Sequence, residues 1–126
     1  RVLALAGREA DIVGINPAIR SGRVDGDAAK DGAAAVTDQK LAWVRDAAGE
    51  GYAELEIQML IFACVVIDDR PADEPAGYTH ARVGSVAPTG DDVAARRERW
   101  DTSYLVVQGA DAMRAAAPVV ARLAGT

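Results

Sequence analysis

The chain has 126 residues, half of them apolar, with 26% charged side chains and a net charge of −5. This composition is typical of one globular domain with a real core and excludes a disordered chain. We expect no nucleic acid as a partner because Lys and Arg form no basic block. Arg96, Arg97 and Arg99 cluster, but acidic residues surround them, as on a solvated helix face: Asp91, Asp92, Glu98 and Asp101.

The apolar segments and the single cysteine limit where the protein can be located and which covalent or metal sites it can contain. The longest apolar run is far shorter than the ~20 residues of a membrane span, and no basic segment precedes a short apolar one as in a secretory signal. We therefore expect no membrane contact and a cytoplasmic protein. Cys64 is the only cysteine, so no intramolecular disulfide and no cysteine-based zinc site are expected.

The first half of the chain predicts helix, strand, helix. Apolar spacing predicts a helix from residue 2 to about residue 7–10, and a short buried strand over residues 11–16 that Pro17 ends. After a Gly- and Ser-containing loop, Val36, Leu41, Val44 and Ala48 recur at helical spacing. They predict one helix over about 27–48, ended by Gly49.

The second half predicts two further strand–helix units. Residues 55–67 are apolar in both alternating sets, which is typical of a parallel strand covered on each face. Thr89 and Asp92 resemble a capping box, predicting a helix from there to about Trp100. A strand over 103–108 and a last helix with Asp111 as its cap and Pro118 as a kink complete the chain.

The order of elements is therefore a helix followed by three strand–helix repeats. Such alternation indicates an α/β fold with parallel strands and right-handed crossovers. Three strands cannot close a barrel, which needs eight units and roughly 250 residues. The pattern alone fits a small three-layer α/β domain and a piece of a (β/α)8 barrel equally well.

Three stretches carry a resemblance to a known family. They are Arg1-Val-Leu-Ala-Leu-Ala-Gly-Arg-Glu-Ala-Asp-Ile-Val-Gly-Ile-Asn16, Val83-Gly-Ser-Val86 with the helix after it, and residues 103–107 with 117–125. In order and spacing they are similar to the second half of luciferase-like monooxygenase barrels, above all the branch that uses the deazaflavin coenzyme F420. The resemblance implies the C-terminal part of a (β/α)8 barrel, with strands six, seven and eight. Between residues 69 and 80 the chain is shorter than that family.

The resemblance also implies an activity. Members of the family transfer hydride between F420, or FMN, and an organic small-molecule substrate, and the protein binds and orients the cofactor. It further implies that most cofactor contacts come from the first five strands. We therefore expect this chain to be inactive when isolated.

Candidate substrate-binding residues follow from the rule that barrel active sites lie at the carboxyl ends of strands. Asn16 and Gln108 stand at two such ends, and their carboxamides can hydrogen-bond a substrate. Arg20, in the loop after the first strand, is a candidate partner for an anionic group. His80 is the only histidine, with an unperturbed pKa near neutrality. The competing interpretation of all four is ordinary turn or loop structure.

Two hypotheses stay open. A barrel fragment would expose a sheet edge where strand five belongs, which predicts a homodimer through that edge. The alternative is a stand-alone small α/β scaffold or interaction protein that binds no cofactor. A flavodoxin-like module is disfavoured, because a helix precedes the first strand and no Ser-, Thr- and Gly-rich phosphate loop follows it.

Overall fold

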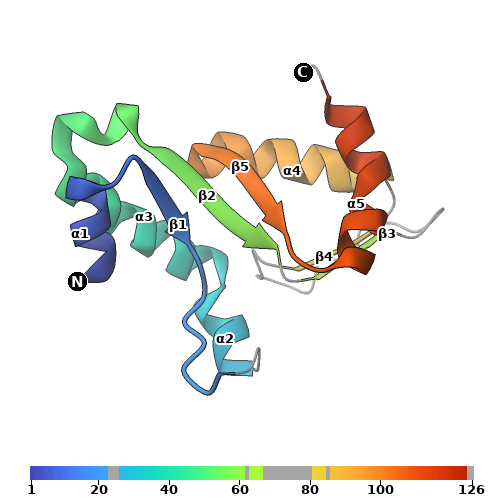
Figure 1. The fold of residues 1–126 in the computed structure, drawn as a ribbon, viewed down its shortest axis with the longest axis horizontal. Helices are drawn as coiled ribbons and strands as arrows, with labels where there is room; N and C mark the ends of the chain where they lie inside the picture. The colour runs from blue at the N-terminus through green and yellow to red at the C-terminus, as the bar shows by residue number, and fades with distance from the viewer. Residues whose placement is uncertain (23–25, 62, 67–80, 85, 125–126) are drawn as a thin grey trace.

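The computed structural model describes residues 1–22, 26–61, 63–66, 81–84 and 86–124 (Figure 1). Its helices are α1 (Val2–Glu9), α2 (Gly26–Asp31), α3 (Ala34–Ala48), α4 (Val86–Trp100) and α5 (Ala110–Leu123), with a 3-10 helix η1 (Gly49–Glu54) after α3. Its strands are β1 (Ile12–Ile15), β2 (Glu56–Ile61), β3 (Ala63–Val66), β4 (Ala81–Gly84) and β5 (Thr102–Val107). The predicted α/β alternation is confirmed.

Three strands form an open parallel sheet in the order β1-β2-β5, which confirms the predicted parallel arrangement. The register aligns Ile15 with Met59 and Met59 with Leu105. A second parallel pair joins β3 to β4. The sequence predicts no strand over β4, because a four-residue segment that contains Arg82 gives little strand signal.

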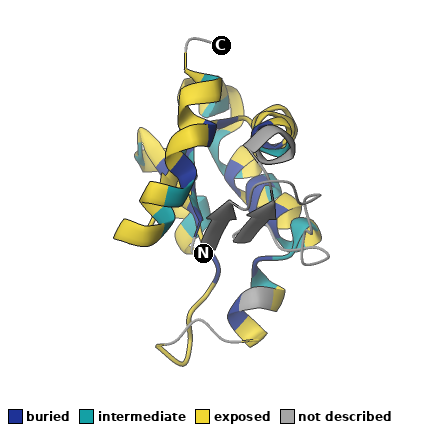
Figure 2. Cartoon of the chain, turned by 90° about the vertical axis from the view of Figure 1, so that its right-hand side faces the viewer, coloured by how far each residue is buried: buried dark blue, intermediate teal, exposed yellow. Residues whose placement is uncertain are grey.

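The core lies on one face of the three-stranded sheet. Alternate residues of β1 and β2 point to this face and pack with α3 and α4; the fully or almost fully buried members are Val13, Ile15, Leu41, Val44, Ile57, Met59 and Trp100. A second cluster joins Ile61 to Ala116 of α5. In Figure 1, α3 and α4 lie behind the strands, and Figure 2 shows the buried residues gathered on the inner sides of the helices.

The opposite face of the sheet is not covered by any described helix. Ile12 is 51% exposed, Tyr104 40% and Val106 39%. Here the expectation of a sheet covered on each side was wrong for the described part of the chain. Apolar residues on both faces of a strand indicate that both faces tend to be buried, but they do not indicate which element packs against each face.

Two close contacts bind the helices to one another. A Cβ at Gly7 of α1 would lie 2.7 Å from the Val44 carbonyl oxygen, so the glycine lets α1 approach α3 closely. Asp38 of α3 accepts hydrogen bonds from Trp100 Nε1 at 2.7 Å and from an Arg99 guanidinium nitrogen at 2.8 Å. Together these contacts fix α1, α3 and α4 as one layer.

Several predicted boundaries were wrong for local reasons. The helix expected over 27–48 is two helices, since the chain turns at Gly32 and extends at Ala33 (φ −67°, ψ 151°). Helix α4 begins at Val86, so Thr89 lies inside it and does not cap it. Gly109 is the N-cap residue of α5, with Asp111 in the first turn, and α5 is one helix with Pro118 inside it. No described helix is both long and apolar enough to cross a membrane.

The two faces of β1 allow a matched test of this packing. Replacing buried Ile15 with Ala should lower the free energy of unfolding by about 2–5 kcal/mol, because it leaves a cavity. The same change at Ile12, on the opposite face, should cost less than about 1 kcal/mol. Urea denaturation followed by tryptophan fluorescence measures both. Equal costs would show that the Ile12 face is also covered in solution.

The Asp38 contacts predict a pH dependence. Hydrogen bonds from Arg99 and Trp100 outweigh partial burial and lower the pKa of Asp38 below its ordinary value. The stabilisation is thus complete above about pH 4 and is lost as the pH falls through the lowered pKa. In Asp38→Asn the unfolding free energy should fall less steeply below pH 4 than in the unaltered chain. Asp46→Asn, on the same helix, is the control. The prediction is contradicted if the unfolding free energy of Asp38→Asn depends on pH below about pH 4 as steeply as that of the unaltered chain.

Candidate functional site

The uncovered face carries the residues that alternate with the core. By register, Gly14, Gln58 and Tyr104 lie side by side across the three strands, and Leu60 pairs with Val106 in a later row. Asn16 follows β1 on the same alternation as Ile12 and Gly14. The sheet therefore presents a mixed row of carboxamide, phenol and aliphatic side chains on its open side.

Gly14 makes room for two carboxamides on this face. A Cβ at this position would lie 2.9 Å from Gln58 Oε1 and 3.4 Å from Asn16 Nδ2. Both amide groups therefore stand over the backbone of Gly14, one from β2 and one from the end of β1. Together they offer hydrogen-bond donors and acceptors without net charge.

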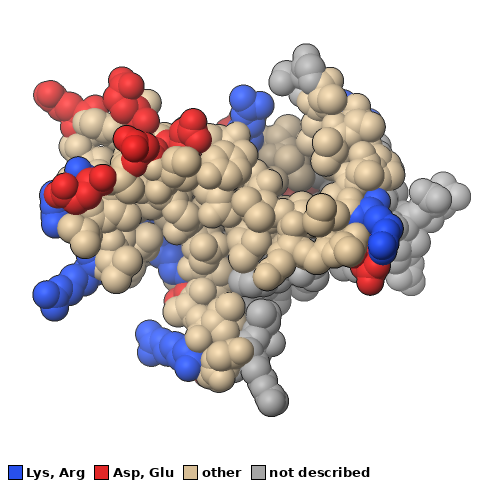
Figure 3. All heavy atoms as spheres, viewed as in Figure 1, with Lys and Arg blue, Asp and Glu red and all other residues tan. Residues whose placement is uncertain are grey.

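Charge is distributed around this face rather than on it. Figure 3, drawn from the side on which the strands face the viewer, shows a largely uncharged centre. Acidic side chains gather at the end where η1 and the start of β2 lie, and basic side chains lie toward the margins. The described face thus suits a neutral, flat or apolar group better than a highly charged one.

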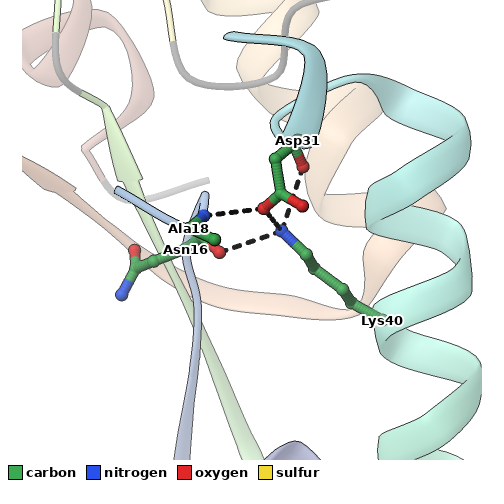
Figure 4. Close-up of polar contacts among 4 residues, drawn as sticks. All are labelled: Asn16, Ala18, Asp31 and Lys40. Atoms are coloured by element: carbon green, nitrogen blue, oxygen red, sulfur yellow. Dashed lines mark hydrogen bonds and ion pairs between the residues drawn. The ribbon is translucent and has the colours of Figure 1, made fainter. Parts of the chain in front are cut away.

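A buried ion pair fixes the loop at the carboxyl end of β1 (Figure 4). Lys40 of α3 is 7% exposed, and its Nζ donates to the Asn16 carbonyl oxygen at 3.0 Å, to the Asp31 carbonyl oxygen at 3.0 Å and to Asp31 Oδ2 at 2.5 Å. These three acceptors match the three protons of the ammonium group. Asp31 Oδ2 also accepts the Ala18 amide at 2.7 Å.

The ionised form of Asp31 is favoured by its surroundings. Partial burial acts to raise the pKa of Asp31, but hydrogen bonds from Lys40 and the Ala18 amide, with the charges of Lys40 and Arg20, outweigh it and lower the pKa. The carboxylate therefore stays charged at neutral pH. The Lys40–Asp31 pair holds the loop throughout the physiological range.

Arg20 lies in a hollow beside this pair. The hollow has a volume of about 230 Å³ and is lined by Ala18, Arg20, Ser21, Asp27 and Asp31. Its two carboxylates are already ion-paired, Asp31 with Lys40 and Asp27 with Lys30. The structure thus places Arg20 where a small anionic group has access to it, next to the loop that carries Asn16.

The other predicted residues do not join this cluster. By register, Asn16 after β1 is level with Val106 of β5, and β2 lies between these two strands. Gln108 is two residues, or about 7 Å, further along the chain than Val106. The backbone N–H of Gln108 donates to the Ile61 carbonyl oxygen at 3.3 Å, which continues the β2–β5 hydrogen-bond ladder. His80 lies outside the described residues. The structure therefore groups Asn16 with Arg20 and sets Gln108 apart.

Two residues of the site were missed in the sequence. Lys40 lies four residues after Val36 and four before Val44, on the apolar stripe of its helix, where a lysine signals a buried ion pair. Gln58 is the one polar residue between Ile57 and Ile61. Both were detectable as polar residues at positions that the pattern assigns to burial.

No protein-family model, curated protein or solved structure matches the chain. Within the described ranges, no group of three or more His, Cys, Asp and Glu side chains is placed to hold a metal ion. The geometry of the open sheet face and of the loop after β1 is therefore the structural basis for a functional proposal.

The buried pair makes a specific stability prediction. Lys40→Met should lower the free energy of unfolding by about 2–4 kcal/mol, because it leaves the Asp31 carboxylate partly buried without its partner. Lys30→Met removes the other lysine, whose side chain is 78% exposed, and should change stability by no more than about 0.5 kcal/mol. Urea denaturation of both variants tests this. Similar small effects would show that the buried pair contributes little.

Proposed function

We propose that this chain is the C-terminal part of a luciferase-like (β/α)8 barrel and contributes to an F420-dependent oxidoreductase. The single observation that carries the proposal is the one-sided sheet: parallel strands with helices on one face and an uncovered face opposite. In a barrel the helices form the outer ring and the other face of each strand points inward.

The strand order supports the same architecture. Strands β1, β2 and β5 are neighbours in the order in which the chain meets them, as successive barrel strands are. The β3–β4 pair is an addition to a plain strand–helix repeat. It lies in the connection between β2 and α4, and barrel enzymes place their variable insertions in loops after strands.

The residues present fit one side of the cofactor. F420 or FMN supplies the hydride chemistry, and the protein supplies binding and orientation. The carboxamides of Asn16 and Gln58 and the space over Gly14 suit the polar edge of a flat heterocycle. Among the described residues, Arg20 is the cation beside the loop for an anionic group, so most contacts to an anionic cofactor would come from elsewhere.

The substrate in this proposal is a small organic molecule at the carboxyl ends of the strands. Asn16 would donate or accept a hydrogen bond, and Arg20 would meet an anionic substituent. Gln108 would contact only a ligand long enough to span β2 from the Asn16 side.

The free edges of β1 and β5 support a further part of the proposal. In the described sheet each of these strands pairs on one side only, and unpaired strand edges bind other strands. We propose that two copies of the chain associate through such an edge. The homodimer is thus a proposed partner arrangement alongside the small-molecule substrate.

Cofactor binding tests the proposal directly. The 126-residue chain is titrated with F420 and, separately, with FMN, while fluorescence anisotropy of the cofactor is followed and sedimentation velocity reports the oligomeric state. We expect saturable, weak binding of F420, because only one side of the site is present. Weak binding here means a dissociation constant on the order of micromolar to millimolar. If neither cofactor binds at roughly several hundred micromolar protein, the proposal is contradicted and a scaffold or interaction protein is favoured.

A further inference from the structure

We infer that Lys40 is a positioning residue of the candidate site, which it serves by fixing the loop that carries Asn16 and Arg20. The inference rests on the proposed function, because it assigns Lys40 a role at the same ligand site. The resemblance does not point to this lysine, whereas its place on the apolar stripe of α3 marks it as a buried polar residue.

The first step is the geometry of the ammonium group. Lys40 Nζ reaches the carboxyl end of β1 from the buried side of α3 and bonds the Asn16 carbonyl oxygen at 3.0 Å. The Asn16 carboxamide points away from Lys40, onto the uncovered face (Figure 4). Holding the carbonyl on one side of the chain therefore sets the direction of the side chain on the other.

The second step is the relay through Asp31. The same ammonium holds Asp31 Oδ2, and that oxygen accepts the Ala18 amide at 2.7 Å. Ala18 lies two residues after Asn16 and two before Arg20, so both candidate side chains flank the restrained amide. The ion pair thus acts on the backbone between the two groups that would touch a ligand.

The third step separates positioning from mere stability. A methionine–leucine pair would fill the same space, and replacing a buried ion pair with apolar residues is often neutral for folding. The double variant removes the partners of the Asn16 and Asp31 carbonyl oxygens and of the Ala18 amide. Asn16 and Ala18 are exposed and Asp31 is half-buried, so water can replace these partners. The fold can therefore do without the charges, whereas the loop loses its restraint.

The experiment compares the unaltered chain with the double variant Lys40→Met/Asp31→Leu. The double variant should unfold at nearly the same urea concentration as the unaltered chain. Its Ala18 amide should exchange with solvent about tenfold faster, as expected for one lost hydrogen bond, while the Met59 amide in β2 is unaffected. Its affinity for F420, or for FMN if that is the cofactor bound, should fall by at least about tenfold.

Two further variants complete the test. Lys30→Met is the matched control and should match the unaltered chain in all three measurements, because Lys30 is exposed and pairs with Asp27 on the surface. Lys40→Arg keeps the charge opposite Asp31, and we expect it to fold even if the double variant does not. Its planar guanidinium is a poor match for three converging acceptors, and we expect faster Ala18 exchange and weaker cofactor binding.

The outcomes are distinguishable. If the unaltered chain binds neither cofactor, the proposed function fails before any variant is compared, and the inference falls with it. If the unaltered chain binds but the double variant binds equally well, or if Ala18 exchange is unchanged, only the role of Lys40 is overturned. Loss of binding in proportion to loss of global stability would also overturn it, because that is the signature of a structural residue.

Discussion

The constraint on which the structure depends is that the three-stranded sheet of β1, β2 and β5 buries only one face against the described helices. Val13, Ile15, Ile57 and Met59 pack against α3 and α4, and this packing places these two helices on one face of the sheet. The Gly7 contact with α3 and the Asp38 bonds to α4 then hold the helices as one layer. A second cluster joins Ile61 to Ala116 of α5, and the opposite side of the three-stranded sheet is left for other contacts.

The sequence predicts the elements well because their signals are local. Short apolar runs locate the three strands of the main sheet, and apolar residues at the helical period of about 3.6 locate the helices after them. The one-sided cover is a tertiary property: Leu60 and Val106 are as apolar as Ile61, yet the helices pack against Ile61. The wrong start of α4 shows the limit of a local signal: Thr89 has the capping preference, yet the helix begins three residues earlier, at Val86.

The candidate site was predicted only in part. Asn16 and Arg20 follow from the rule for strand ends, and the structure places both on one loop. Gln108 follows from the same rule but is displaced by the register of β5. Lys40 and Gln58 can be assigned to the site only when it is known which face of α3 and β2 is buried. A single sequence does not give that face directly. The polar residue on an apolar stripe was the signal available for both.

Three arrangements could cover the exposed face of the sheet or pair its edge strands, β1 and β5, and they differ in how much of this they achieve. A second copy packed on the uncovered face would bury Ile12 and Tyr104 but leave the edges of β1 and β5 unpaired. Pairing of two copies through one edge would leave the face exposed. Continuation of the sheet by further strand–helix units, curling until the ends meet, covers the face and pairs both edges at once. The one-sided packing thus supports the barrel part of the proposal, in which the Lys40-held loop would lie at the mouth of the barrel.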